Sequence, residues 1–478
     1  ASMTSITIKG STSPRLEFRI FFVPSVAMIF HRETAAPSIH SLRLILGLML
    51  GLMLMLSALP ARAISLIRDP DIEYALARVA DPILSAAGLG SNVRILVVND
   101  QSLNAFVIDN QHIFIHRGML MRMDTPEMLQ AIIAHEAAHI TNGHIARRIT
   151  NMGNAQSAAG LGMALALAAA AATGNAEVGA GLAIGANSAA QRRFLAHSRA
   201  EETSADHSGA RYMTRAGIDP SGAVSVHELF RGQEMLNISR QDPYMRSHPL
   251  TRDRIRAMQT YVDTHTGTFD KQTDAEYWFA RARGKASAFM RSSSWTLRRA
   301  NSSPTRDIAL MREAVAYHKL PDHASARAKI DQALAERPDD PFYYELKGQI
   351  LLESRRFSDA VEAYKRATEL APGNALCMAS YGRALLVSGN PEEALPILEA
   401  ARSRDFRDLR LLRDLGAAYA HTGQNGMASL ATAERYAFQG RLKDAEIHAR
   451  RASHLLPTGS GPWRRAEDVL RAAKRAQK

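Results

Sequence analysis

The sequence has a single cysteine among 478 residues, Cys377, so no disulfide can form within the chain. Its helical, apolar surroundings suggest a small core residue. Long apolar runs are also lacking. The 13 residues 44–56 are fewer than the roughly 20 that a membrane-spanning helix needs. The lack of several long spans disfavours a protease embedded in the membrane, and no motif typical of nucleic-acid binding is present.

The short apolar run 44–56 has the features of an export signal. Arg43 precedes it, and Ala61 and Ala63 come after it with the spacing of a signal-peptidase site. We therefore expect residues 1–63 to be an N-terminal extension and cleavable signal peptide. No cysteine directly follows the run, which excludes a lipoprotein anchor. The formal net charge is +12, and residues 64–478 hold 53 basic against 45 acidic residues. This excess suits an anionic membrane surface or acidic partners, although a solvated basic face is the default interpretation.

The stretch with the clearest chemistry is H-E-x-x-H at residues 135–139. Thr125 can cap a helix here and Pro126 suits its first turn, so His135 and His139 project from one helical face. Two imidazoles on that face can bind one zinc ion, while Glu136 faces the water that the ion activates and acts as general base. Two solvated histidines on a surface helix are the alternative.

The residues just after this motif narrow the choice of a third ligand. A metzincin needs glycine and histidine where the chain has Asn142 and Ile145, so that class is excluded. His144 lies five residues past His139. On a continuing helix it would turn away from the ligand face, and we expect a structural or solvent-facing role for it.

A carboxylate from a second helix is the other common solution. Glu202 and Asp206 lie four residues apart in a charged segment, so Glu202 can bind the metal while Asp206 accepts the free ring N–H of a ligand histidine. Glu201 has Ala205 in that place, which makes it the weaker candidate. A solvated acidic face is the alternative for this cluster. Between the two motifs, the Ala- and Gly-rich residues 157–190 predict a helical hairpin beside the active site, or transient membrane contact.

Several motifs together resemble the metallopeptidase family that includes HtpX, the CaaX prenyl proteases and BepA-like periplasmic proteases. They are Asn104-Ala105-Phe106, the strand ending at Arg117-Gly118, His135-Glu136-x-x-His139 and Glu202-x-x-x-Asp206. The resemblance covers roughly residues 66–260. It implies an α+β gluzincin-type domain that binds one zinc per chain through His135, His139 and Glu202. Glu136 is then the catalytic base, and Asp206 supports a ligand histidine. Two departures are the residues Asp109-Asn110-Gln111, in place of a Pro-Gly-Gly-like turn, and Ser204, in place of an acid.

The same resemblance implies further binding residues. His248, in the run Ser247-His248-Pro249-Leu250, is implied as a removable fourth metal ligand that keeps the enzyme latent. Arg254 is a candidate for oxyanion stabilisation, with a helix-start salt bridge as the more ordinary use. The patterns of residues 94–98, 105–108 and 112–116 predict strands. The edge formed by Asn104, Ala105 and Phe106 is the candidate substrate-binding segment.

The C-terminal third repeats with a period of 34 residues. Gly348, Gly382 and Gly416 share this spacing, as do Pro338 and Pro372, which is the tetratricopeptide period. We therefore expect a mainly α protein with a small β-sheet and an all-α repeat solenoid. The predicted domains are a metallopeptidase at 64–263, a linker helix and polar linker at 264–306, repeats at 307–458 and a basic tail at 459–478.

These features together predict a zinc endopeptidase that is exported to the periplasm and that can contact the membrane surface peripherally. The resemblance implies quality control or assembly of outer-membrane proteins, with unfolded or misassembled precursors as substrates and the assembly machinery bound through the repeats. The alternative is a chaperone or assembly adaptor that acts mainly through the repeats.

Overall fold

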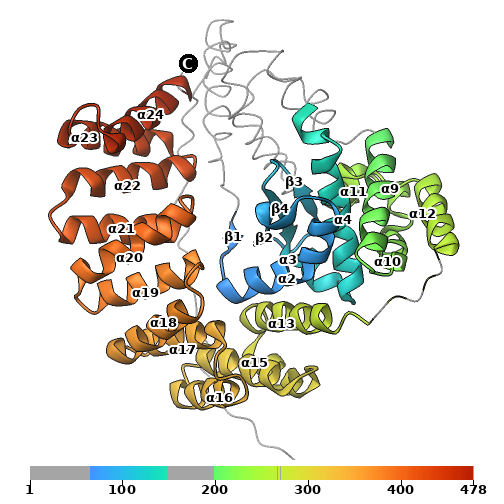
Figure 1. The fold of residues 1–478 in the computed structure, drawn as a ribbon, viewed down its shortest axis with the longest axis horizontal. Coiled ribbons are helices and arrows are strands. Elements are labelled where there is room, and N and C mark those ends of the chain that lie inside the picture. Colours follow the sequence, from blue (N-terminus) through green and yellow to red (C-terminus); the bar gives the residue numbers. More distant parts are fainter. Residues whose placement is uncertain (1–64, 148–198, 266, 268, 270, 477–478) are drawn as a thin grey trace, which may run out of the picture. The chain divides into compact units, whose positions relative to one another are not determined.

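A small sheet covered by helices begins the fold (Figure 1). The structure, a computed structural model, describes residues 65–147, 199–265, 267, 269 and 271–476. Within them the sheet has four strands in the order β1-β2-β4-β3. The β2–β4 pair is parallel, and β1 and β3 run antiparallel to their neighbours. The strands are β1 (Leu66–Ile67), β2 (Arg94–Val98), β3 (Ala105–Val107) and β4 (His112–His116).

The two faces of this sheet are buried by different groups. Alternate residues such as Val97 and Ile115 join the main core, together with α2 (Pro70–Ala86) and α4 (Pro126–Thr141). On the opposite face Phe106 stacks on Phe114, with ring centroids 5.1 Å apart. The period of two along each strand produces this division. The expected strands are therefore present, and β3 ends one residue earlier than we predicted.

Helix α4 carries the H-E-x-x-H motif through the core. The hydroxyl of Thr125 accepts a hydrogen bond from the backbone N–H of Met128, and Pro126 occupies the first turn, as the sequence indicates. The helix ends at Thr141 because Gly143 adopts a left-handed conformation, with φ of 69°. The chain reverses there, and a new helical turn begins at His144. Our premise of a helix continuing past residue 141 was therefore wrong.

The second acidic motif lies on α9 (Arg199–Arg215), which packs closely against α4. Gly209 allows this approach, since a Cβ at its position would lie 3.2 Å from the carbonyl carbon of Ala134 and from the nitrogen of His135. The other elements of this part are η1 (Gly90–Asn92), α3 (Arg117–Arg122), α10 (Ser221–Phe230), η2 (Gln233–Met235), η3 (Ile238–Arg240), α11 (Pro243–Ser247) and α12 (Arg252–Thr264).

Residues 264–306, predicted as a linker helix and polar linker, are more ordered than that description. Helix α13 (Thr273–Met290) packs against both α2 and α15 (Arg306–Lys319). The expected polar stretch contains α14 (Ser293–Arg299) and η4 (Ala300–Ser302). Arg281 and Lys285 of α13 are fully buried. The described residues from 65 onward belong to one compact unit. Our domain boundaries themselves stay a prediction.

Antiparallel helix pairs form the C-terminal part, in agreement with the 34-residue period. They are α15 (Arg306–Lys319), α16 (His323–Glu336), α17 (Pro341–Glu353), α18 (Phe357–Leu370), α19 (Ala375–Val387), α20 (Pro391–Arg404), α21 (Leu409–His421), α22 (Asn425–Phe438), α23 (Leu442–Leu455) and α24 (Gly461–Ala476). A Cβ on Gly348 would meet the Tyr364 ring at 2.8 Å, and one on Gly382 would meet Leu398 at 2.6 Å. Glycine is thus required at these two helix crossings, whereas a Cβ on Gly416 would come no closer than 3.5 Å to its neighbours.

The end of the array differs from our prediction of a basic tail. Residues 461–476 form α24, which packs on α22 and α23 through Ala466, Val469 and Leu470. Its amphipathic spacing, with basic residues on the exposed side, explains why composition alone suggested a tail.

The structure confirms the predicted burial of Cys377, but it does not describe the predicted signal peptide or the hairpin. Cys377 is fully buried in α19, as expected. The predicted signal peptide and the hairpin at 157–190 lie outside the described residues. Among the residues that are described, none of the helices has both the length and the apolar character to cross a membrane.

Candidate metal centre

Four side chains from three segments meet at one buried point. They are His135 and His139 of α4, Glu202 of α9 and His248 just after α11. One potential ligand atom from each lies within 4.8 Å of all the others. None of the four residues is more than 6% exposed. The sequence-predicted ligand set is therefore brought together in space.

The distances that join His135 and Glu202 to the other donor atoms are close to those around a tetrahedrally coordinated zinc ion. The Nε2 atoms of His135 and His139 are 3.0 Å apart, and His248 Nδ1 lies 3.3 Å from His135 Nε2. Glu202 oxygens lie 3.5, 3.4 and 3.1 Å from the His135, His139 and His248 nitrogens. Zinc bonds of about 2.0–2.2 Å at tetrahedral angles separate ligand atoms by roughly 3.3–3.6 Å. Three nitrogens and a carboxylate at these distances form a donor set that suits zinc.

Asp206, itself bound by Arg254, contacts the ring nitrogen of His135 that points away from the donor cluster. His135 Nδ1 lies 3.0 Å from Asp206 Oδ1, so the ring donates there and directs Nε2 toward the donor cluster. Arg254 donates to both oxygens of Asp206, at 2.6 and 2.8 Å. Burial alone would raise the pKa of Asp206, but the Arg254 guanidinium outweighs it and holds that pKa well below its usual range.

Electrostatics in the cluster favour positive charge. Burial lowers the pKa of His135, yet hydrogen bonds to Asp206 and Glu202 outweigh burial and raise it to about 10. For His139, desolvation dominates, and its pKa lies well below the ordinary value. The pair can therefore carry one positive charge between the two carboxylates, which is the place where a divalent cation fits.

Glu136 lies in the same buried cluster and is directed at His248. Its Oε1 is 3.5 Å from His248 Nε2, while Nδ1 of the same ring faces Glu202. Tyr244 packs against the His248 ring at a centroid distance of 4.7 Å. The His248 ring therefore lies between the carboxylates of Glu136 and Glu202.

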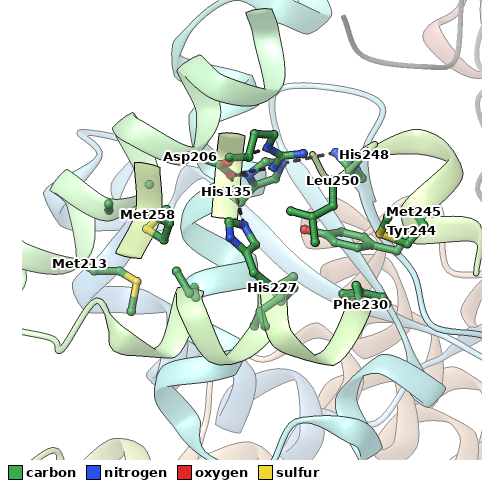
Figure 2. A pocket seen from close by; sticks show the side chains of 17 residues that line it. His135, Asp206, Met213, His227, Phe230, Tyr244, Met245, His248, Leu250 and Met258 are labelled. Atoms are coloured by element: carbon green, nitrogen blue, oxygen red, sulfur yellow. Dashed lines mark hydrogen bonds and ion pairs between the residues drawn. The ribbon is translucent and has the colours of Figure 1, made fainter. Parts of the chain in front are cut away.

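Sequence reasoning missed one buried histidine near the cluster. His227 of α10 lies 3.9 Å from Asp206, and burial lowers its pKa to about 4. It faces a cavity of about 30 Å³, room for about one water, beside His135, Tyr244 and Phe230 (Figure 2). Nothing in the sequence distinguishes His227 from a core histidine.

His144 is also buried, so of the structural and solvent-facing roles that we expected for it, the solvent-facing one is wrong. It is 2% exposed, and its Nδ1 lies 2.9 Å from Nδ1 of His139. The pair Asn142-Gly143 is a typical helix C-terminus, which would have indicated that the chain turns back toward His139.

The remaining candidates lie outside the ligand group. The side chains of Asn104, Ala105 and Phe106 are buried, and Asn104 O accepts a hydrogen bond from His116 N. Only the backbone of this segment is thus available to a substrate. Arg254 donates to Asp206 and to Pro249 O and lies 2.9 Å from Glu202 Oε2, which favours the salt-bridge use over oxyanion stabilisation.

A buried H-E-x-x-H helix with a carboxylate from a second helix defines a metallopeptidase. Residues 67–262 match the model described as peptidase family M48, and residues 294–341 and 351–419 match tetratricopeptide repeat models. The chain is therefore a metallopeptidase whose residues 67–262 match this family model and whose C-terminal part matches tetratricopeptide repeats.

Several curated proteins are similar to this chain. The chain is 22% identical over 404 residues to the Beta-barrel assembly-enhancing protease of Escherichia coli (strain K12), covering 83% of this chain and 81% of that protein. Identity to the protein of the same name from Yersinia pestis is 22% over 356 residues, which covers 73% of this chain and 72% of that one. The Mitochondrial metalloendopeptidase OMA1 of Schizosaccharomyces pombe is 26% identical over 188 residues, 39% of this chain and 52% of that protein.

Proposed function

We propose that the chain is a zinc-dependent endopeptidase, exported to the periplasm, that acts on unfolded or misassembled outer-membrane proteins. The observation that carries the proposal is the buried donor group of His135, His139, Glu202 and His248 beside Glu136. The names of the bacterial relatives support the substrate class. The short apolar run 44–56 with Ala61 and Ala63 supports export.

Each polar residue of the site has a task in this proposal. His135, His139 and Glu202 would hold the zinc ion, which when bound activates water and polarises the scissile carbonyl. Glu136 takes a proton and delivers it to the leaving amine, and its burial keeps bulk water from competing. Asp206, fixed by Arg254, keeps the His135 ring oriented.

The substrate would lie extended along β3. In the described part of the chain, β3 is the last strand of the sheet and pairs with β4 on one side. Leu103, just before it, accepts a hydrogen bond from the backbone N–H of Tyr244 at 3.1 Å. A peptide added at this edge would therefore run toward the turn that carries His248.

His248 keeps the site latent in our proposal. Its ring takes the place that water needs among the ligands and lies beside the carboxylate of Glu136. The residue comes after a short helix, α11, and precedes Pro249, so the segment can move without disturbing α4 or α9. Latency protects folded neighbours from cleavage.

The test compares His248→Ala with wild type on one unfolded substrate. The variant should cleave faster and should bind zinc no more tightly, because a ligand is lost. His112→Ala is the matched control, since His112 contacts Asp109 at the far end of β4 and should leave the rate unchanged. Equal cleavage rates for His248→Ala and wild type would refute the proposal that His248 keeps the site latent.

An assembly adaptor is the second candidate, because a site containing His248 is closed to substrate. Glu136→Gln discriminates between the two functions. It should abolish cleavage, and a cell in which this variant fully supports outer-membrane assembly would favour the adaptor. Export is tested by N-terminal sequencing, for which we expect a start at or near Ile64.

A further inference from the structure

The proposed metal site needs two oriented imidazoles, and the two have different partners on the ring nitrogen that points away from the site. His135 donates its Nδ1–H to Asp206. For His139, Nδ1 lies 2.9 Å from Nδ1 of His144. Metal-binding histidines almost always donate the second ring N–H to a fixed partner. His144 is therefore placed to do for His139 what Asp206 does for His135.

Proton counting decides the direction of this contact. Two ring nitrogens at 2.9 Å form a hydrogen bond only when one of them carries a proton. His139 directs Nε2 into the donor cluster, 3.0 Å from His135 Nε2, so that atom must keep its lone pair to bind a cation. A neutral His139 then carries its proton on Nδ1 and donates it. His144 must accept through Nδ1 and carry its own proton on Nε2.

We propose that His144 is a positioning residue, which fixes the tautomer and ring orientation of His139 by accepting its Nδ1 proton. The inference rests on the proposed metal site. Glycine at position 143 makes it possible, because the left-handed turn ends α4 and brings His144 back against the last ligand turn. His144 is nearly fully buried and its ring packs 5.0 Å from the His139 ring, so both partners are held in place.

A neutral acceptor also suits the charge of the centre. Glu136, Glu202 and Asp206 already place three carboxylates in one buried cluster, with Arg254 as the cation bound to two of them. An aspartate in place of His144 would add another buried negative charge, which is costly unless it is paired. An imidazole orients His139 without that cost.

The experiment uses a pair of nearly isosteric variants of the full chain. In His144→Asn the amide oxygen can stand where Nδ1 stood and accept the same hydrogen bond, whereas His144→Leu places a methyl group there. We expect His144→Leu to weaken zinc binding by about 10–100-fold, measured by competition with a chelator, and His144→Asn to stay close to wild type. His116→Leu is the control, because His116 is equally buried but contacts Ser102.

A second measurement keeps the inference testable if the leucine variant does not fold. Nitrogen-15 spectra of wild-type, zinc-loaded protein should show the proton on Nδ1 of His139 and on Nε2 of His144. The opposite assignment would overturn the proposal. Zinc binding by His144→Leu that is as tight as in wild type would also overturn the proposal. If wild type itself binds no zinc, the proposed function fails instead, so the two failures are distinguishable.

Discussion

The buried arginine of α13 offers the most demanding test of how the two parts of the chain are joined. Arg281 is fully buried and donates to Asp71 of α2 at 2.7 Å and to both oxygens of Asp340 at 2.5 and 2.8 Å. Its guanidinium also lies 4.1 Å from the centre of the Tyr343 ring. One side chain thus connects the helix that covers the sheet to the start of α17.

Replacing Arg281 by methionine keeps much of the volume and removes the charge. It leaves Asp71 and Asp340 buried without this partner, and such a loss costs about 3–5 kcal/mol. Arg78→Met is the matched control. Its pair with Asp274 is 45% and 60% exposed, so we expect a loss below about 1 kcal/mol.

Urea unfolding of both variants measures the difference. Adding Asp340→Asn to Arg281→Met should restore part of the lost stability, because it removes one unpaired charge. Asparagine can still accept the hydrogen bonds from Phe342 N and Tyr343 N that cap α17. A loss for Arg281→Met no larger than that of Arg78→Met would refute this reasoning.

Two further predictions concern the repeats. Burial raises the pKa of Glu345 from 4.5 to about 7, so the folded protein keeps this proton to a higher pH than the unfolded chain and loses stability as pH rises from 4.5 to 7. Glu345→Gln should remove this loss, on the order of 1–3 kcal/mol above pH 7, and should change stability little near pH 4.5. If the melting temperatures of wild type and Glu345→Gln change with pH in the same way, the prediction is wrong. Gly382→Ala should destabilise by about 1–3 kcal/mol because its Cβ would meet Leu398 at 2.6 Å, whereas Gly373→Ala, with open space around it, should be neutral in the same assay.

Local patterns predicted much of the fold. Examples are the cap at Thr125, the strands with a period of two and the 34-residue repeat. Each of these patterns depends on residues close together in the sequence or at a fixed spacing, so it can be recognised without knowledge of distant contacts. The ligand group could be anticipated for the same reason, because His135 and His139 share a helical face. Glu202 needed an argument by elimination, since its partner lies 63 or more residues away.

Long-range packing explains what sequence reasoning missed. We predicted a linker helix and polar linker at residues 264–306 because of the serine- and asparagine-rich runs 292–295 and 301–304. The helix there carries Arg281 and Lys285, and both are buried against acids from distant segments. The contact between His144 and His139 was not predicted because we continued α4 past Gly143. No pattern within a single segment indicates which distant carboxylate will neutralise a buried cation.

Metal content and proteolysis measured together test the central claim. The measurement uses His248→Ala, in which the proposed latch is absent, with and without Glu136→Gln. We predict one zinc per chain in both proteins, cleavage of an unfolded substrate by the first, and none by the second, because Glu136 supplies the base and is not a ligand. Absence of zinc from both, or undiminished cleavage with Glu136→Gln, would contradict the account.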